Sequence, residues 1–394
     1  MKDKNILDLT IKQKSEELLQ TIRDDTDVNI EGLVTDDDYS EIVGRNCENI
    51  VGYKKIPMGV SNRSVIINRR KFFVPICTTE GALVASMCRG IKLINTSGGV
   101  NGYVENLGIT RGFSMEFDDF DEAITFYRWL KYQENINELK RVGEMNSRYC
   151  KIKSITSKNV FGSMVFVKVT AFTGDAMGMN MITKACDQIA KRICEIFFNA
   201  RLVCISANTC TDKKWSVENY CNGRGRRVFL NLKIKESDLK AVMKVSIDEL
   251  LLVYHSKIVI GSSLVLGGFN CQAANYVAAT FLAFGQDLGH IIESSNCIIT
   301  MNRVDDCLSV CLNMPSLVVG TVGGGTHLEP AKSMLKQFNY VDDHIIADEE
   351  DNSTSSNYLA LLIASAVLAG EISCLASIAE NSLLDAHLRL NRKH

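Results

Sequence analysis

Hydrophobic and polar positions along the chain follow helical and strand periods that change from one segment to the next. The first residues are highly charged, and a helical pattern covers residues 11–22, with Leu18, Leu19 and Ile22 on its apolar face. This pattern predicts a small N-terminal helical domain over residues 1–47.

Residues 112–205 alternate between strand-like and helix-like patterns. The strand-like segments are residues 113–117, 149–155, 164–172 and 202–206, and the helix-like segments are residues 120–137 and 177–198. The resulting order, βαββαβ, is that of a ferredoxin-like domain, whose two ends lie close together. We therefore expect an inserted small domain over residues 112–205.

The remaining residues, 48–111 and 206–394, are expected to form one large domain around this insertion. Its longest apolar runs, residues 276–285 and 358–370, are too short to cross a bilayer and predict buried helices. The fold class is therefore α+β, with a buried central helix in the large lobe. No apolar signal segment stands at the N-terminus, so the chain as given is expected to be cytoplasmic.

Charge and cysteine content narrow the possible functions. Forty-four basic residues nearly balance 46 acidic ones in a chain of 394 residues, so the broad positive field of a nucleic-acid-binding protein is absent. Arg224, Arg226 and Arg227 form a local basic cluster, for which a solvated loop is the ordinary interpretation. The 14 cysteines lack paired C-x-x-C spacings, which favours reduced thiols. Cys307 and Cys311 would need two further ligands to bind zinc, so no metal is expected.

Two glycine-containing segments are candidates for binding an anionic cofactor. In residues 175–181, Asp-Ala-Met-Gly-Met-Asn-Met, Asp175 is a candidate N-cap, and a helix start with small residues exposes free N–H groups. A capped core helix is the alternative. Residues 323–325 form a Gly-Gly-Gly turn that exposes its backbone, with an ordinary loop as the alternative. No G-x-G-x-x-G motif follows a strand.

The motifs, taken together and in their order along the chain, resemble those of the eukaryotic-type (class I) 3-hydroxy-3-methylglutaryl-CoA (HMG-CoA) reductase family. They are Asp175 to Met181 above, Glu48-Asn-Ile-Val-Gly-Tyr53, Thr78-Thr-Glu-Gly-Ala-Leu-Val-Ala-Ser86, Cys210-Thr-Asp-Lys-Lys214, Gly285-Gln-Asp287 and Gly320-Thr-Val-Gly-Gly-Gly-Thr326. The resemblance covers most of the chain from residue 48 onward. It implies reduction of HMG-CoA to mevalonate and CoA by NADPH, in isoprenoid and sterol biosynthesis.

The resemblance implies four catalytic residues: Glu80, Lys213, Asp287 and His387. Lys213 would stabilise the oxyanion, His387 would protonate the CoA thiolate, Glu80 would donate the second proton, and Asp287 would couple Glu80 to Lys213. Each residue alone has an ordinary alternative: a first-turn carboxylate for Glu80, an exposed loop lysine for Lys213, a cap for Asp287 and an exposed helical histidine for His387.

The resemblance also implies three groups of binding residues. The group for the substrate's carboxylate and reacting centre is Arg111, Ser206, Asp212, Lys214, Lys257 and Asn275. The group for CoA is Tyr53, Ser86, Arg89 and Lys244. The group for the dinucleotide is Asp175, Met177, Gly178, Met179, Asn180, Gly323, Gly324, Gly325, Thr326, Asn391 and Arg392, with Ser147, Arg148 and Tyr149 at the 2′-phosphate of NADPH.

Some positions depart from the family's pattern. His290 stands in a stretch where the family has small and amide residues, Gln272 replaces a common histidine, and Trp215 replaces a proline. Two alternatives remain: an NAD-preferring oxidative relative, against which Arg148 argues, and a non-catalytic CoA-binding or assembly paralogue. The family further implies a homodimer or homotetramer with active sites between subunits, and an endoplasmic reticulum anchor in many members.

Overall fold

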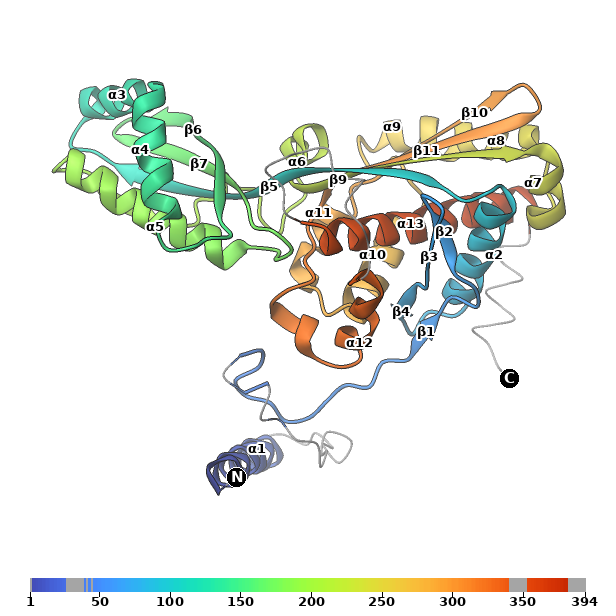
Figure 1. Cartoon of the computed structure of the whole chain (residues 1–394), viewed down its shortest axis with the longest axis horizontal. Coiled ribbons are helices and arrows are strands. Elements are labelled where there is room, and N and C mark those ends of the chain that lie inside the picture. Colours follow the sequence, from blue (N-terminus) through green and yellow to red (C-terminus); the bar gives the residue numbers. More distant parts are fainter. Residues whose placement is uncertain (1, 26–38, 40–41, 44, 340–352, 382–394) are drawn as a thin grey trace. The chain divides into compact units, whose positions relative to one another are not determined.

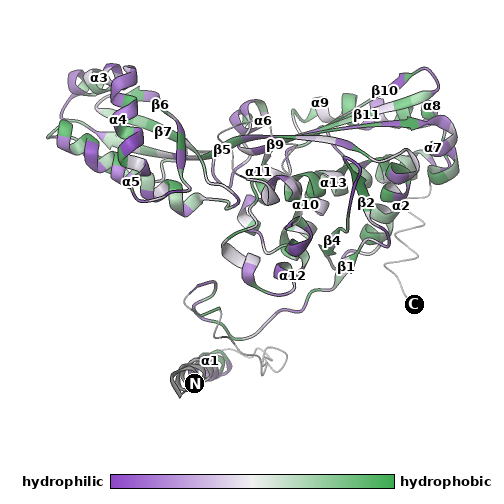
Figure 2. Ribbon diagram, viewed as in Figure 1, coloured by the Kyte–Doolittle hydropathy of each residue, from purple (hydrophilic) through white to green (hydrophobic). Residues whose placement is uncertain are grey.

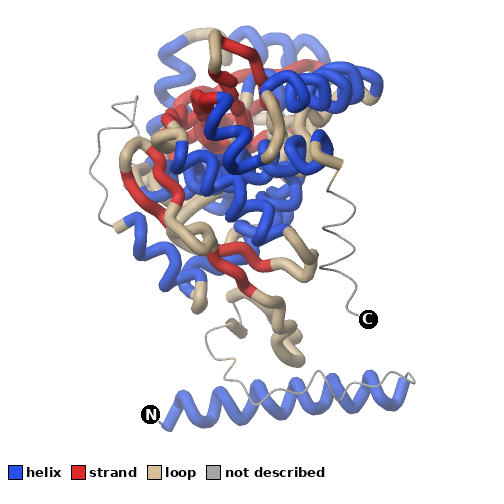
Figure 3. Tube along the Cα trace, turned by 90° about the vertical axis from the view of Figure 1, so that its right-hand side faces the viewer, coloured by secondary structure: helices blue, strands red, loops and turns tan. Residues whose placement is uncertain are grey.

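The computed structural model describes residues 2–25, 39, 42–43, 45–339 and 353–381. The chain forms two compact units, residues 1–57 and 58–394. In the first unit, α1 (Lys2–Asp25) is a single uninterrupted helix (Figure 3). It is longer than the predicted 11–22 because neither glycine nor proline interrupts the polar residues around the apolar stripe.

A seven-stranded antiparallel sheet organises the second unit (Figure 1). Its path runs in the order β10-β11-β9-β5-β7-β6, and β8 pairs with the free edge of β5. The strands are β5 (Asn101–Glu116), β6 (Lys151–Phe161), β7 (Met164–Phe172), β8 (Arg201–Cys204), β9 (Gly225–Lys235), β10 (Ile298–Val304) and β11 (Cys307–Leu317).

The long strand β5 belongs to both halves of this sheet. Its first half pairs with β9, and its second half, from Ile109, pairs with β7 and β8. The register shifts between Asn106 and Gly108, where Gly108 adopts φ +82°. Such a bulge bends a strand, so one strand can serve two packed layers. The predicted strand 113–117 covers only the end of β5, because the glycines and polar residues before it weaken the strand pattern.

The larger hydrophobic core lies under β9, β10, β11 and the first half of β5. Its central element is α13 (Ser355–Ala379), which is hydrophobic along its length and is buried among the surrounding elements (Figure 2). Helices α2 (Leu83–Thr96) and α10 (Ala273–Ala283) pack against it. The prediction of buried helices at 276–285 and 358–370 therefore agrees with the structure.

Close approach of backbones allows these helices to cross. A Cβ atom at Gly90 of α2 would lie 2.0 Å from the Ala369 carbonyl oxygen of α13, and one at Gly370 would lie 1.8 Å from the Tyr276 ring. Among the described residues, α13 is the one helix long and apolar enough to cross a membrane, and 94% of its most apolar window is buried. The apolar run 358–370 is thus part of a longer helix than expected, although its burial is as expected.

A second hydrophobic core lies between the sheet half β8-β5-β7-β6 and three helices. These are α3 (Phe120–Trp129), α4 (Gln133–Glu144) and α5 (Met179–Ile196). The single helix predicted over 120–137 is wrong, since the chain turns between α3 and α4. The Asn135 side chain donates to the Trp129 carbonyl at 2.8 Å and so satisfies the end of α3.

Shorter elements complete the second unit. They are β1 (Met58–Val60), β2 (Val65–Ile67), β3 (Arg70–Phe72), β4 (Pro75–Cys77), α6 (Val217–Asn222), α7 (Glu236–Met243), α8 (Ile247–Tyr254), η2 (His255–Gly261), α9 (Ser262–Leu264), η3 (Leu288–His290), α11 (Ile291–Ser294), η4 (Gly324–His327), α12 (Ala331–Leu335) and η5 (Lys336–Phe338). All 14 cysteines lie within the described residues and are free thiols, in agreement with the sequence-based expectation.

Candidate active site

Lys213 lies on a strained loop between β8 and α6. Thr211 and Lys213 adopt φ +59° and +55°, a left-handed conformation that costs free energy for residues other than glycine. The loop is attached to β5, because the Thr110 hydroxyl of that strand donates to the Cys210 carbonyl at 2.8 Å. Ser216 caps α6 through the Asn219 N–H at 3.0 Å. These contacts hold the loop backbone in the strained conformation from which the Lys213 side chain projects.

The Lys213 ammonium pairs with Asp287, whose carboxylate lies 2.9 Å away. Asp287 follows α10 and caps η3 by accepting from the Gly289 N–H at 2.9 Å. Burial raises the pKa of Asp287, but the hydrogen bonds from Lys213 and Gly289 and the His290 charge outweigh burial and hold that pKa below its ordinary value. The ordinary capping role and the expected site role thus coincide in one side chain.

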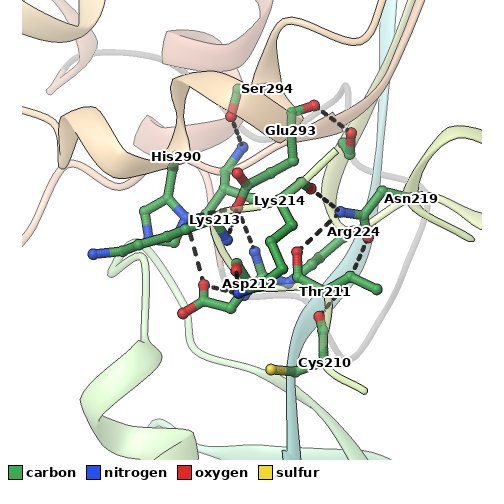
Figure 4. A network of polar contacts seen from close by, with 12 residues as sticks. Cys210, Thr211, Asp212, Lys213, Lys214, Asn219, Arg224, His290, Glu293 and Ser294 are labelled. Carbon is green, nitrogen blue, oxygen red and sulfur yellow. Dashed lines mark hydrogen bonds and ion pairs between the residues drawn. The ribbon is translucent and has the colours of Figure 1, made fainter. Parts of the chain in front are cut away.

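A buried layer of charged side chains supports this pair (Figure 4). Arg224 donates to Asp212 at 2.9 Å and to Glu293 at 2.8 Å, and Arg224 and Glu293 are 1% and 0% exposed. The same Glu293 oxygen accepts the backbone N–H of Lys213 at 3.1 Å and lies 2.8 Å from His290 Nδ1. The strained lysine is therefore tied through its own backbone to a buried carboxylate.

Sequence analysis missed part of this layer. Glu293 was not a candidate, and the interpretation of the basic cluster as a solvated loop is wrong for two of its members. Arg224 is enclosed as above, and Arg226 is 4% exposed and donates to the Val319 carbonyl and the Asn357 side chain, both at 2.8 Å. The unusual His290 could have pointed to Glu293 from the sequence alone, because Glu293 lies one helical turn after it.

Three members of the layer could also be viewed as metal ligands. Ligand atoms of Asp212, His290 and Glu293 lie within 4.8 Å of one another. However, the Arg224 guanidinium already donates to both carboxylates. A cation placed there would meet this fixed positive charge, so these residues fit a guanidinium better than a metal ion.

Four of the residues expected at the substrate's carboxylate form a connected group. Arg111 on β5 donates to the Ser206 hydroxyl at 2.7 Å and lies 3.8 Å from Asp212, and Lys214 donates to the Asp212 carbonyl at 3.0 Å. Arg111 is further held by Thr183 of α5 at 2.9 Å. This group adjoins Lys213 through the loop and offers several cationic donors.

The other two residues expected at the substrate lie near α10. Asn275 donates to Gln272 at 3.2 Å. Burial raises the pKa of Glu371, and the Lys257 ammonium opposes that rise, which places Lys257 near this carboxylate. Glu371 in turn accepts the backbone N–H groups of Cys271 and Gln272 at 2.6 and 2.7 Å, so it anchors the start of α10.

Glu80 lies at the start of the segment leading into α2, where it is exposed. Its backbone N–H donates to the Thr78 hydroxyl at 3.0 Å. Burial raises the pKa of Tyr276 on α10, and the Glu80 charge adds to this rise, so Glu80 lies near that helix. Among the described residues, no hydrogen bond or ion pair joins Glu80 to Lys213 or Asp287. The fourth expected catalytic residue, His387, lies outside the described residues.

The residues expected at CoA belong to several elements. Ser86 and Arg89 on α2 donate to the Ser373 hydroxyl of α13 at 2.9 and 3.0 Å. Lys244 ends α7 with φ +63° and donates to the Ala241 carbonyl at 2.9 Å. Tyr53 belongs to the first unit, where its ring lies 5.5 Å from that of Tyr39.

The two glycine-containing segments expected at the dinucleotide lie side by side. Ala176 and Val322 form a parallel bridge, and the Thr321 N–H donates to the Asp175 carbonyl at 2.8 Å. A Cβ at Gly320 would lie 2.4 Å from the Met177 nitrogen, so only glycine permits this approach. Segments far apart in sequence thus form one backbone-rich surface.

Asp175 has a different role from the one expected. It is not the N-cap of the following helix: α5 begins at Met179, after Gly178 in the left-handed conformation with φ +92°. The Asp175 carboxylate instead accepts from the backbone N–H and the hydroxyl of Ser356, at 2.8 and 2.7 Å. It therefore stabilises the start of α13, and the N–H groups at the start of α5, from Met179 and Asn180 onward, have no side-chain cap.

The Gly323 to Thr326 turn is also joined to the segment that carries Asp287. A Cβ at Gly285 would lie 2.4 Å from the Gly325 carbonyl oxygen, and Gln286 accepts the Gly320 N–H at 2.9 Å. Gly323 and Gly324 have positive φ, with open space where a side chain would stand. The turn therefore offers its backbone beside the Lys213–Asp287 pair.

Ser147 connects the expected 2′-phosphate residues to α5. Its hydroxyl accepts the Cys150 N–H at 3.2 Å and lies 3.9 Å from the Met181 sulfur in the first turn of α5. The Arg148 guanidinium lies 4.9 Å from the centre of the exposed Tyr149 ring. Asn391 and Arg392 lie outside the described residues.

Comparison with known proteins identifies a family. The family model for hydroxymethylglutaryl-coenzyme A reductase matches residues 14–392. The 3-hydroxy-3-methylglutaryl-coenzyme A reductase of Cyberlindnera jadinii is 38% identical over 360 residues, covering 90% of this chain and 38% of that protein. Reductase 1 of Dictyostelium discoideum is 38% identical over 359 residues, covering 90% of this chain and 64% of that protein. The chain thus spans less than two thirds of the length of these relatives.

Solved structures show the same fold at low sequence identity. The class II 3-hydroxy-3-methylglutaryl-CoA reductase from Streptococcus pneumoniae, bound to NADPH, has a TM-score of 0.63 and 17% identity, with 84% of this chain and 87% of that chain covered. A second structure of a reductase from the same organism has a TM-score of 0.61 and 18% identity, with 84% of this chain and 87% of that chain covered.

Proposed function

The chain belongs to the hydroxymethylglutaryl-coenzyme A reductase family, and we propose on that basis that it reduces HMG-CoA to mevalonate and CoA with NADPH. The observation that carries the proposal is the Lys213–Asp287 pair at 2.9 Å beside the glycine turn that ends at Thr326. A cation held at one orientation next to a backbone-rich surface suits a reaction in which negative charge develops on a carbonyl oxygen.

The residues fit a dinucleotide in two respects. Open space above Gly323 and Gly324, and free N–H groups at the start of α5, provide backbone donors for phosphates. Arg148 and Tyr149 are exposed beside that helix and match a 2′-phosphate through a guanidinium and a hydroxyl. NADPH, when bound, would supply one hydride, so two NADPH molecules in succession would provide the hydrides for the thioester carbon and for the aldehyde.

The chain's own residues would manage charge and protons. Lys213 stabilises the oxyanion, while Asp287 and the Glu293 carboxylate hold the lysine in position. His387 protonates the departing CoA thiolate, and Glu80 donates a proton to the second oxyanion. Arg111 and Lys214 bind the substrate's carboxylate, which places the thioester near Lys213.

We further propose that residues 112–205 form the inserted cofactor lobe, of ferredoxin-like topology. The strand order β8-β5-β7-β6, with all neighbours antiparallel, supports this assignment, as does the separate hydrophobic core of this segment. Residues 48–111 and 206–394 would form the substrate lobe, and residues 1–47 the small N-terminal domain.

A homo-oligomer is proposed as the active form. In support, the face of β5, β9, β10 and β11 is an open hollow that exposes stacked rings of Tyr103 and Phe229, whose centres lie 6.3 Å apart. These rings are 41% and 39% exposed, which suits an apolar face covered by another subunit.

The proposed function can be tested with purified chain, HMG-CoA, and NADPH or NADH in parallel. Loss of reduced-nucleotide absorbance and release of CoA thiol are followed together. Two NADPH oxidised per CoA released, with little oxidation of NADH, is the expected result. Turnover with NADH alone would favour the oxidative relative, and a folded chain that binds HMG-CoA without turnover would favour the non-catalytic paralogue.

A further inference from the structure

His290 is almost completely buried, at 1% exposure, between two carboxylates of the candidate site. Its Nδ1 lies 2.8 Å from Glu293 Oε1, and its Nε2 lies 3.6 Å from Asp287 Oδ2. Nε2 has no hydrogen-bond partner among the described residues and faces that aspartate. The ring therefore bridges a buried carboxylate and the carboxylate that pairs with Lys213.

Glu293 is the inner anchor of this bridge. Its Oε1 receives three donors at once: the Lys213 backbone N–H, the Arg224 guanidinium and the His290 ring. A fully buried carboxylate is costly unless its charge is compensated by donors and cations. Any change in the His290 ring thus acts on the same oxygen that holds the Lys213 backbone.

The His290 ring lies among three carboxylates, those of Glu293, Asp287 and Asp212. The permanent cations that pair with these carboxylates are Lys213 and Arg224, together with Arg111 at 3.8 Å from Asp212. A protonated His290 ring places a further positive charge within 3.6 Å of all three carboxylates. It then donates to Glu293 and faces Asp287, while Asp212 Oδ1 lies 3.6 Å from Nδ1 as a further counter-charge.

We propose that His290, as an imidazolium, is a positioning residue that couples Asp287 to the buried Glu293–Arg224 pair and so holds Lys213 ready for the oxyanion. This role rests on the proposed reductase function for its catalytic consequence, but the bridge itself is a property of the folded chain. It also accounts for a histidine at a position where small and amide residues are usual in the family's pattern.

Two substitutions separate charge from hydrogen bonding. His290→Gln keeps an N–H donor toward Glu293 without charge, and His290→Leu removes both. His255→Gln, at an exposed histidine of η2, is the matched control. Loss of a charge-assisted hydrogen bond lowers kcat about tenfold in His290→Gln and further in His290→Leu. KM for HMG-CoA stays within about twofold of wild type, because the one residue of the substrate-carboxylate group near the ring, Asp212, keeps its hydrogen bond from Arg224 at 2.9 Å.

The pH profile of kcat distinguishes positioning from simple support of the fold. A positive His290 contributes to the low pKa of Asp287, against the opposing effect of burial and together with the hydrogen bonds from Lys213 and Gly289. Without that charge the pKa of Asp287 rises, so the acid limb of kcat moves to higher pH in His290→Gln. Full activity in His290→Gln, or an unmoved acid limb, overturns the proposal while leaving the reductase function intact.

A readout independent of activity uses the full chain labelled with ¹³C at histidine Cε1. The chain has six histidines, and the signal missing from His290→Gln identifies His290. The expected His290 signal in the wild-type chain is that of an imidazolium at about pH 7. In Asp287→Asn a neighbouring negative charge is lost, so the His290 ring binds its proton less tightly. A neutral ring at that pH overturns the proposal, and this result stands even if the wild-type chain shows no reductase activity.

Discussion

Gly289 packs directly against the Lys213 side chain: a Cβ atom built at Gly289 would lie 2.8 Å from Lys213 Cδ and 3.0 Å from Lys213 Cε. The backbone at Gly289 is not in the left-handed region, so an alanine there would be opposed by the lysine side chain, which would have to shift, and not by its own φ. The lysine that pairs with Asp287 therefore packs over a position where an added methyl group would displace it.

We predict that Gly289→Ala displaces the Lys213 ammonium from Asp287 and lowers kcat about a hundredfold, because oxyanion stabilisation depends on placement within about an ångström. The fold survives, since the far end of a lysine side chain can move. Steady-state kinetics and a thermal melt measure both effects. Ile292→Ala, at an exposed residue of α11, is the control. Wild-type kcat in Gly289→Ala would contradict the assigned role of Lys213.

Lys213→Ala should abolish reduction of HMG-CoA and of free mevaldehyde alike, because both reactions pass through an oxyanion. The expected loss is about a hundredfold or more in kcat for each substrate. Parallel assays with the two substrates give the comparison. Lys191→Ala removes a lysine whose ion pair with Asp187, at 2.7 Å, lies on the surface of α5, and it should leave both rates unchanged. Retained mevaldehyde reduction in Lys213→Ala would argue against oxyanion stabilisation.

Arg148→Ala should reduce the preference for NADPH over NADH about tenfold or more, since a guanidinium that contacts a phosphate dianion contributes a charge-assisted bond. The ratio of kcat/KM for the two nucleotides is the measurement. Arg128→Ala, on the exposed face of α3, tests whether loss of any surface charge has the same effect. An unchanged ratio in Arg148→Ala would remove Arg148 from the 2′-phosphate site.

Gly90→Ala should destabilise the second unit by about 3 kcal/mol or more, because overpacking against a rigid backbone cannot be relieved by a rotamer change. The added Cβ would lie 2.0 Å from the Ala369 carbonyl, so α2 and α13 would have to separate. Urea denaturation measures the change in free energy of unfolding. Gly267→Ala, whose Cβ would meet only the Trp215 ring at 4.0 Å, should have a small effect. Equal stability of the two variants would contradict the close crossing.

The Asp287 carboxylate should make stability depend on pH in the acid range. Burial raises the pKa of Asp287. The hydrogen bonds from Lys213 and the Gly289 N–H, together with His290, lower that pKa by more than burial raises it, so the pKa is below the ordinary 3.8. The folded state therefore binds the proton less tightly than the unfolded state, so the stabilisation is present above 3.8 and is lost as pH falls through the lowered pKa. Urea denaturation at about pH 5 and about pH 3 should show a smaller loss in Asp287→Asn than in wild type. Equal losses in both proteins would contradict the lowered pKa.

Local patterns predicted many of the elements of the second unit. The alternation over residues 164–172 matches β7, and the apolar runs match α10 and α13. Predictions were weaker where tertiary contacts decide the outcome. β5 extends through Asn101 to Gly108 because β9 pairs with it, and α3 ends at Trp129 because the Asn135 side chain satisfies its last turn.

For the candidate site, the sequence by itself determined the motifs, their order and the family they resemble, because glycines, charged residues and their spacing are visible without coordinates. Only the tertiary structure decided which side chains meet. Asp175 caps α13 and not α5, because Ser356 is brought next to it. Arg224 is buried and paired with Glu293, because η3 and α11 fold over the lysine loop. Burial and pairing between distant segments are properties of packing, and no local pattern encodes them.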